Sequence, residues 1–193
     1  QQQITPTMVN SEYCFICSHL KNCYLLSNAD FDEDCMYSTY LERSKRSLDI
    51  YMGDYCELCY ASSNLFKCFH VLYSANCKEC INVMFSKNLR NCSDCFGCVN
   101  LRNKQYHIFN KPHSKDEYAQ KLVTLDFASY NGVQKTLEDA KKLSLNYPKK
   151  HREGLNNKNV SGDYIFNSKN AINCYEVGGC EDVKHCQFLF LTP

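Results

Sequence analysis

The stretch CKECINVMFSKNLRNCSDCFGC (residues 77–98) contains five cysteines, and its first and last are 21 residues apart. Steps of 21 residues back from Cys98 reach a cysteine each time, at Cys77, Cys56, Cys35 and Cys14. A fixed period of this size is typical of repeat proteins, in which each repeat buries its apolar face by stacking on its neighbours. The stretch therefore predicts a chain built from stacked short repeats.

The residues between these cysteines favour strands over helices. They are rich in Tyr, Phe, Val and Ile, they show no helical apolar stripe, and Ser, Asn and Asp interrupt them. The pattern S-x-N-x-x-x-C recurs at 62–68, 86–92 and 168–174, where Asn suits a left-handed turn. We predict a mainly β protein, a cysteine-rich parallel β-helix (solenoid) with coils of about 21 residues whose recurring cysteines form one inward column.

An α-helical hairpin interrupts the predicted solenoid. Ser114 and Glu117 form a capping box, which predicts a helix that ends near Ala128. Asn131-Gly132 separates it from a second helix that ends before Pro148. Short helices need tertiary packing in water, so we expect apolar contacts with the solenoid from Leu122, Leu125, Leu137 and Leu143.

Four segments follow from this pattern. They are an N-terminal extension (1–12), the cysteine-rich solenoid (13–112), the helical hairpin insert (113–152) and a second, incomplete solenoid segment (153–193). The apolar ending of the second segment predicts an open solenoid end, which a longer chain, a partner or a second copy of the protein would cover.

The fifteen cysteines allow three interpretations. Their odd number and the lack of a secretory signal pattern favour reduced thiols and a cytoplasmic protein over a disulfide framework. Free cysteine packs as a small hydrophobe, so most of these thiols are expected to fill the core. Redox catalysis is disfavoured, because a redox Cys-x-x-Cys needs the N-terminus of a helix.

Structural zinc is the one cofactor that the sequence suggests. Residues 60–76 separate Cys56-x-x-Cys59 from Cys77-x-x-Cys80, and this spacing is found in four-cysteine zinc sites. These four cysteines are the candidate metal ligands. Two facts weaken the prediction: the spacing follows from the repeat itself, and residues three apart on a strand point to opposite faces.

The acidic stretch DFDED (30–34) has the composition of a calcium loop or of a catalytic cluster. A calcium loop needs Gly at its sixth position and Glu at its twelfth, where this chain has Cys35 and Leu41. Glycoside cleavage needs a pair of carboxylates, and no second acidic cluster lies at a matching offset. The stretch is best interpreted as a solvated turn, and no catalytic residue is predicted.

Three segments carry a resemblance to a known family: NCYLLSNADFDEDCMYS (22–38), NCSDCFGCVNLRNKQYHIFNKPHSKDEY (91–118) and YPKK…NVSGDYIFNSKN (147–170). They are similar to uncharacterised cysteine-rich repeat proteins of candidate-phyla bacteria and metagenomes, some of which carry a misleading CaiB/BaiF label. The resemblance implies zinc-ribbon-like cysteine pairs upstream. None precede the repeats here, so we expect the chain to be a segment of a longer protein.

Three functional hypotheses remain. The first is a non-enzymatic solenoid scaffold that presents an extended surface to a macromolecular partner, most simply a protein. The second is a zinc-binding regulatory or nucleic-acid-associated protein, and the third is a carbohydrate-acting β-helix enzyme. The segment NLRNKQY (100–106) has the aromatic and basic residues that bind single strands, but a net charge of +1 argues against nucleic acid as the main partner. No apolar run is long enough for a membrane span.

Overall fold

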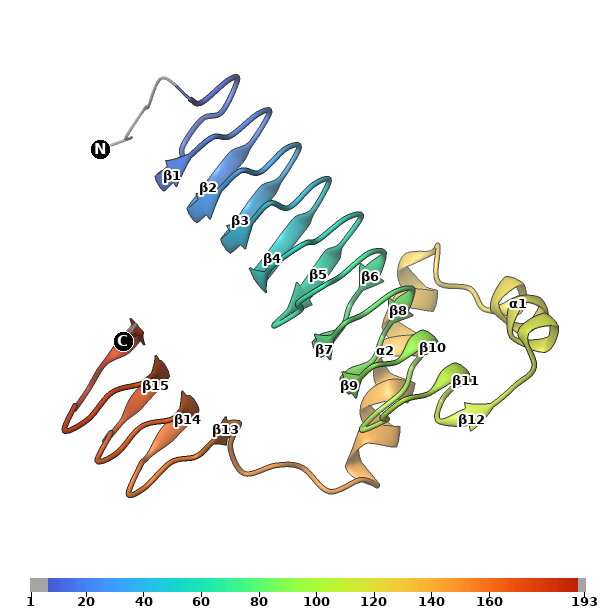
Figure 1. Cartoon of the computed structure of the whole chain (residues 1–193). Coiled ribbons are helices and arrows are strands. Elements are labelled where there is room, and N and C mark those ends of the chain that lie inside the picture. Colours follow the sequence, from blue (N-terminus) through green and yellow to red (C-terminus); the bar gives the residue numbers. More distant parts are fainter. Residues whose placement is uncertain (1–6, 191–193) are drawn as a thin grey trace. The chain divides into compact units, whose positions relative to one another are not determined.

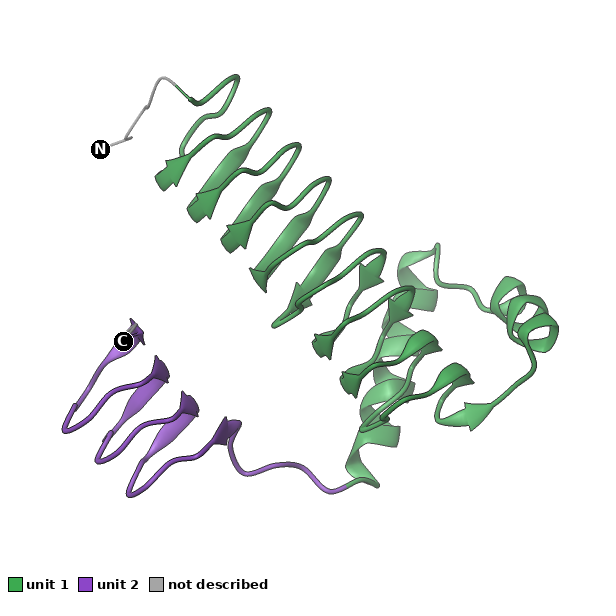
Figure 2. Ribbon diagram, in the orientation of Figure 1, with its two compact units in different colours: residues 1–147 green, residues 148–193 purple. Residues whose placement is uncertain are grey.

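The computed structural model describes residues 7–190, and over this range the protein is mainly β with two helices (Figure 1). The first strands are β1 (Phe15–Ser18), β2 (Tyr24–Asp30), β3 (Met36–Glu42), β4 (Leu48–Gly53), β5 (Tyr60–Ser63), β6 (Val71–Leu72), β7 (Ala75–Lys78), β8 (Val83–Met84), β9 (Lys87–Arg90), β10 (Ser93–Phe96), β11 (Gln105–Ile108) and β12 (Lys111–Pro112). They are followed by α1 (Lys115–Thr124), α2 (Tyr130–Leu145), β13 (Gly154–Leu155), β14 (Gly162–Phe166), β15 (Cys174–Gly178) and β16 (Gln187–Phe190). The chain divides into two compact units, residues 1–147 and 148–193 (Figure 2). The predicted class, mainly β with a helical insert, is confirmed.

Neighbouring strands of the first unit pair in parallel with a constant 12-residue offset. Tyr24 lies opposite Met36, Met36 opposite Leu48, and Leu48 opposite Tyr60. The chain thus returns to the same side after each 12-residue repeat (Figure 1). Only the last pair, β11 with β12, is antiparallel among the pairs of this sheet. The prediction of a 21-residue coil is wrong, because the paired strands follow the shorter repeat.

Every third side chain points inward. In the first repeat Cys14, Cys17, Leu20 and Cys23 are buried. The residue before each of them has a positive φ, between 51° and 55°. Left-handed geometry costs an L-residue about 1–2 kcal/mol, so burial and sheet hydrogen bonds must offset this cost at each corner. Four three-residue units make up one 12-residue repeat, and they enclose a narrow interior.

This three-residue phase explains why the cysteines suggested a different period. All cysteines from Cys14 to Cys98 are separated by multiples of three residues, and each is buried. Since 21 and 12 are both multiples of three, a step of 21 residues leads from one inward position to another. It does not lead to the paired residue on the neighbouring strand, which is 12 residues away. Cys35 occupies the same position as Cys23 in the next repeat, because the residues that follow them, Met36 and Tyr24, are paired. Cysteines 21 residues apart therefore fall at different positions of the repeat, and the predicted single column of cysteines is not formed.

Small polar side chains suit the interior because each one satisfies backbone groups. The Cys35 thiol donates to the carbonyl of Glu33 at 3.3 Å. One repeat later, the Ser47 hydroxyl makes the same contact with the carbonyl of Lys45 at 2.9 Å. Buried backbone groups are costly when unpaired, so Ser and Cys are interchangeable solutions at these corners. The prediction that the cysteines fill the core is confirmed by the burial of fourteen of them; Cys186 is half-buried.

The two helices pack on the first unit. Tyr118 is buried, and the half-buried Leu122, Leu125 and Leu137 contact a cluster that includes Phe96. Helix α1 also lies against β11. The predicted contacts of these three leucines with the β repeats are confirmed, whereas Leu143 is half-buried and not part of this cluster. The helices belong to the same unit as β1–β12, although the sequence suggested a separate segment.

The boundaries of the helices differ from those predicted. The capping box of Ser114 and Glu117 is present, but α1 ends at Thr124 rather than near Ala128. Helix α2 includes Asn131-Gly132, which was predicted to lie between the helices. The Ser129 hydroxyl accepts a hydrogen bond from the Gly132 amide at 3.1 Å, so this dipeptide lies in the first helical turn. A Cβ on Gly132 would lie 1.8 Å from the carbonyl oxygen of Asp126, which explains the glycine.

The second unit repeats the same local pattern. Strands β13 to β16 form a four-stranded parallel sheet. Gly154 of β13 lies opposite Ile165 of β14, an offset one residue shorter than that of the next two pairs. The buried positions are again three residues apart, at Ile165, Ser168, Ala171, Cys174, Val177 and Cys180. The predicted return of β repeats after the helices is therefore observed.

Candidate functional site

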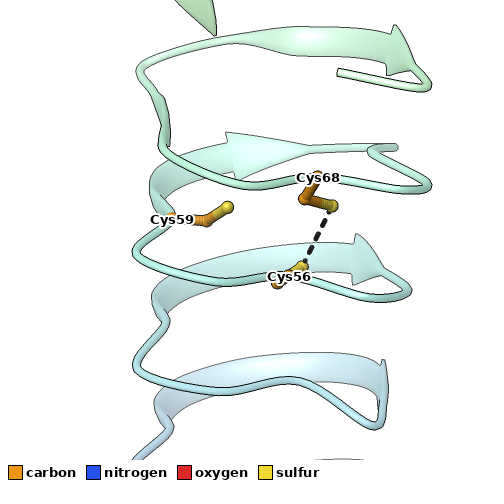
Figure 3. A group of neighbouring side chains, drawn as sticks. All are labelled: Cys56, Cys59 and Cys68. Carbon is orange, nitrogen blue, oxygen red and sulfur yellow. Dashed lines mark hydrogen bonds between the residues drawn. The ribbon is translucent and has the colours of Figure 1, made fainter. Parts of the chain in front are cut away.

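A compact thiol cluster lies inside the first unit. The sulfur atoms of Cys56, Cys59 and Cys68 are all within 4.8 Å of one another, and the three side chains are buried. The sulfurs of Cys56 and Cys68 are 3.4 Å apart (Figure 3). Three mutually close thiols form a suitable ligand set for a soft metal ion.

The 12-residue repeat positions these thiols. Cys56 and Cys59 lie at successive inward corners between β4 and β5, and Cys68 follows Cys56 by one repeat. Gly53, at the corner before Cys56, leaves the space that the sulfur occupies. A Cβ on Gly53 would lie 2.3 Å from the Cys56 sulfur and 2.9 Å from Ile50. The cluster therefore depends on a glycine as well as on the cysteines.

The structure brings together only part of the predicted zinc quartet. Cys56 and Cys59 are neighbours, as predicted, but their third close partner is Cys68. Cys80 interacts with both Cys68 and Cys77. Cys68 was missed because it belongs to no Cys-x-x-Cys pair. The signal that identifies it is the 12-residue spacing of Cys56, Cys68, Cys80 and Cys92.

Two thiols of the cluster, Cys56 and Cys59, are protonated at neutral pH. Hydrogen bonding with Cys59 and Cys68, together with burial, raises the pKa of Cys56 far above its ordinary value. The hydrogen bond with Cys56 lowers the pKa of Cys59, but the contact with Cys68 and burial outweigh it and raise that pKa to about 11. In this state both thiols pack as small apolar side chains.

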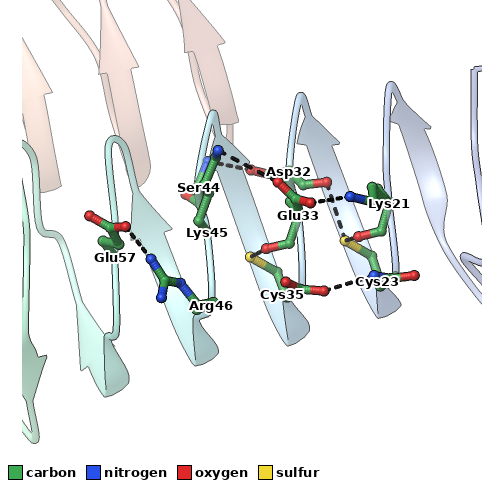
Figure 4. A network of polar contacts seen from close by, with 11 residues as sticks. Lys21, Cys23, Asp32, Glu33, Cys35, Ser44, Lys45, Arg46 and Glu57 are labelled. Atoms are coloured by element: carbon green, nitrogen blue, oxygen red, sulfur yellow. Dashed lines mark hydrogen bonds and ion pairs between the residues drawn. The ribbon is translucent and has the colours of Figure 1, made fainter.

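A ladder of alternating charges runs along the outer surface (Figure 4). The Lys21 amine contacts Glu33 at 2.5 Å, Glu33 contacts Lys45 at 3.5 Å, and Arg46 contacts Glu57 at 2.5 Å. The hydrogen bond from Lys21 lowers the pKa of Glu33. Exposed ion pairs contribute little stability, but like charges would meet if the strands slipped by one repeat. The ladder thus helps to fix the register, and its mixed sign gives no basic track for nucleic acid.

The four acidic residues of DFDED lie in different environments. Asp30 accepts a hydrogen bond from Ser18 and interacts with His19, while Glu33 belongs to the charged ladder. Asp34 accepts from the amide of Asn22. Asp32 points inward and is 1% exposed. The stretch therefore offers separate partners for its carboxylates and no shared catalytic site, which leaves the enzyme hypothesis without support from these residues.

Asp32 itself is an unusual interior residue. One carboxylate oxygen accepts a hydrogen bond from the Ser44 amide at 2.7 Å. The other, Oδ2, has no hydrogen-bond partner among the described residues. Burial raises the pKa of Asp32 to about 7, although the Ser44 amide opposes the shift. Ser44 and Cys56 occupy the equivalent position in the next two repeats, so packing at this position does not require an acidic side chain.

An aromatic stripe follows two adjacent positions of the 12-residue repeat. It consists of Tyr13, Tyr24, Leu25, Met36, Tyr37, Leu48, Tyr60, Leu72, Tyr73, Met84, Phe85, Phe96, Ile108 and Phe109. Neighbouring rings are in contact on either side of Leu48, with centroids 5.5 Å apart for Tyr13 and Tyr24 and 5.2 Å apart for Phe85 and Phe96. Such ring pairs add stability beyond their buried area. The first of the two positions is apolar in every repeat from Tyr24 to Ile108, whereas Asp49 interrupts the second.

The helices cover one end of the aromatic stripe and leave the other exposed. Phe85 and Phe96 are 3% and 0% exposed beneath the helical residues. In contrast, Leu25 and Tyr37 are 46% and 55% exposed. The segment suggested for single-stranded nucleic acid lies near the covered end, where Arg102 donates to the carbonyl and side chain of Asn88. These contacts leave that segment less suited to bind nucleic acid.

Comparison of the chain with models of known protein families, with curated proteins and with solved structures finds no match. None of the helices among residues 7–190 has the length and apolar character needed to cross a bilayer. The aromatic stripe and the thiol cluster are therefore the features that bear on function.

Proposed function

We propose that the chain is a non-enzymatic β-solenoid scaffold that binds a protein partner through the exposed end of the aromatic stripe, residues 13–60. The constant 12-residue offset supports the solenoid, because a chain that returns to the same side after each repeat extends by stacking. The observation that carries the proposal is the continuity of this stripe from an exposed end to a covered one.

The covered end indicates what kind of partner fits. There the stripe contacts Leu122, Leu125, Val133, Leu137 and Ala140 of the helical segment. Three of these, Val133, Leu137 and Ala140, recur along one face of α2. Apolar side chains at this spacing are the typical anchors of a helix that lies in a hydrophobic groove. We therefore assign to the exposed end an amphipathic helix of a partner protein.

The exposed end has the composition of an interface. Tyr13, Tyr24, Tyr37 and Tyr60 are aromatic residues with a polar tip, and these are enriched at binding hot spots. The first unit also carries the charged ladder, whose positive and negative groups are interspersed. A binding surface of apolar centre and mixed polar surroundings favours a protein over a nucleic acid or an anionic lipid surface.

Site-specific photo-cross-linking tests this proposal in cells that produce the protein. A photoreactive phenylalanine analogue replaces Tyr37 in the stripe, and the matched control replaces Lys45 on the charged ladder. We expect cross-links to one defined protein from position 37 only, and their loss when Leu25→Ser is added. Cross-linking that is equal at both positions, or unchanged by Leu25→Ser, would contradict the assignment of the stripe as the binding surface.

A zinc-binding protein is the second candidate function. The thiol cluster favours it, and that site is independent of the aromatic stripe.

A further inference from the structure

We propose that the thiolates of Cys56, Cys59 and Cys68 bind one Zn²⁺ ion inside the first unit. This ligand set differs from the two Cys-x-x-Cys pairs suggested by the sequence, because Cys68 joins Cys56 and Cys59 in place of Cys77 and Cys80. The site adds a metal-dependent stabilising role to the scaffold and does not depend on any partner of the aromatic stripe.

The three sulfurs lie close enough together to share one ion. Zinc–sulfur bonds of about 2.3 Å place the sulfurs of a tetrahedral thiolate site about 3.8 Å apart. The Cys56 and Cys68 sulfurs are 3.4 Å apart, and Cys59 lies within 4.8 Å of both. Side-chain rotations that bring the three sulfurs to about 3.8 Å from one another would place them around one ion.

Cys80 and Cys77, the other two cysteines suggested by the sequence, lie outside this ligand set. Cys80 follows Cys56 by two 12-residue repeats, about 10 Å along the stack, and its thiol donates a hydrogen bond to the carbonyl of Cys77. Cys77 occupies a different inward position, that of Leu65 and Leu89.

Packing alone does not require cysteine at these positions. Ser44 precedes Cys56 by one repeat and Ser47 precedes Cys59, and both serines are buried. Val71 follows Cys59 by one repeat and is equally buried. Because the fold accepts serine and valine at these corners, the concentration of thiols around Cys68 is not explained by volume. Their shared property is affinity for a soft cation.

Binding is an exchange of protons for the ion, with no redox step. Three S–H bonds break, three Zn–S bonds form, and three protons pass to solvent. The product carries a net charge of −1, and the fourth position of the ion is left to a water molecule, as in zinc sites with three protein ligands. The free energy of binding is then available to stabilise the folded first unit.

Metal titration of the full chain tests the site. The reduced, chelator-treated protein is mixed with Zn²⁺, passed through a desalting column and assayed for zinc. Cobalt(II) serves as a second probe, because thiolate-to-cobalt charge-transfer absorption reports the number of sulfur ligands. We expect one metal ion per chain and a cobalt spectrum with the charge-transfer intensity of three sulfur ligands.

Two variants remove ligands while keeping the residue types that the fold already uses. Cys68→Ser copies Ser44 in the same inward row, and Cys59→Val copies Val71. Each should weaken zinc binding at least about tenfold, because loss of a group that only supports a metal ligand already weakens binding by about 10- to 100-fold. The matched control is Cys180→Ser in the second unit, where Ser168 occupies the equivalent buried position.

Three outcomes of the metal titration overturn the proposal. They are no retained zinc in the parent chain, equal retention in Cys68→Ser, Cys59→Val and the parent, and equal loss in the control. Circular dichroism distinguishes ligand loss from unfolding, and agreement of the two ligand variants is required for support. Mass analysis without reductant covers the competing chemistry: a Cys56–Cys68 disulfide that persists in the presence of Zn²⁺ also overturns the proposal.

Discussion

Replacing Asp32 with asparagine should change the stability of the protein in a pH-dependent way. The carboxyl is 1% exposed, and burial raises its pKa from 3.8 to about 7. The folded protein therefore holds this proton more tightly than the unfolded chain does. The stability contributed by the protonated carboxyl is complete below about pH 4 and is lost as the pH rises through about 7.

The magnitude follows from the size of that increase. At about 1.4 kcal/mol for each pH unit, a pKa raised from 3.8 to about 7 corresponds to about 4 kcal/mol lost above pH 8. The asparagine side chain keeps an oxygen for the Ser44 amide, but its NH₂ group takes the place of the unpartnered Oδ2. We subtract about 1 kcal/mol for this unsatisfied group. The variant should be about 1 kcal/mol less stable than the parent at pH 4 and about 3 kcal/mol more stable at pH 8.

Urea unfolding at a series of pH values from 4 to 8 measures this difference directly. The difference between variant and parent isolates position 32, because all other titrating groups are shared. Glu12→Gln serves as the control, since it makes the same kind of exchange at an exposed carboxylate of the same unit. A stability difference for Asp32→Asn that does not vary with pH would refute the argument that a buried, poorly satisfied carboxyl titrates near neutrality.

Two further substitutions and one segment replacement test the left-handed corners, Gly53 and the helices. Ile16→Asn should stabilise the protein by about 1 kcal/mol in urea unfolding, because Ile16 is 54% exposed and has a φ of 55° that suits Asn; an equal gain from Phe15→Asn would argue against this cause. Gly53→Ala should destabilise by about 1–3 kcal/mol through overpacking against Cys56 and also weaken zinc binding; unchanged values of both would show that the site relaxes freely. Replacing residues 114–147 with a flexible linker should cause self-association by sedimentation, and a monomeric product would contradict the covering role of the helices.

Much of the fold could be predicted from local patterns. The capping box at Ser114 and the apolar stripe of Leu122 and Leu125 were sufficient to predict a packed helix. The density of aromatic and β-branched residues was sufficient to predict strands. The register could not be predicted, because it depends on which strands meet. The 21-residue and the 12-residue spacing both preserve the three-residue inward phase, and the cysteines alone favoured the wrong multiple.

The left-handed corners were also beyond the sequence pattern. Asn22 and Asn28 have positive φ, as the preference of asparagine predicts, but so do Tyr13, Leu25 and Tyr37. At these positions the inward burial of the following residue outweighs the local preference. Only part of the thiol cluster could be predicted. Cys56 and Cys59 are close in sequence, whereas Cys68 comes close to them only through the 12-residue register.

The 12-residue register generates both the thiol cluster and the aromatic stripe, so both depend on it. Scalar couplings across hydrogen bonds, measured by nuclear magnetic resonance on the deuterated, isotope-labelled chain, report it directly. We predict couplings from the amide nitrogens of Tyr24, Met36 and Leu48 to the carbonyl carbons of Cys35, Ser47 and Cys59. Couplings from these amides to carbonyls in line with the 21-residue spacing would restore the longer repeat and contradict the register, the cluster and the stripe together.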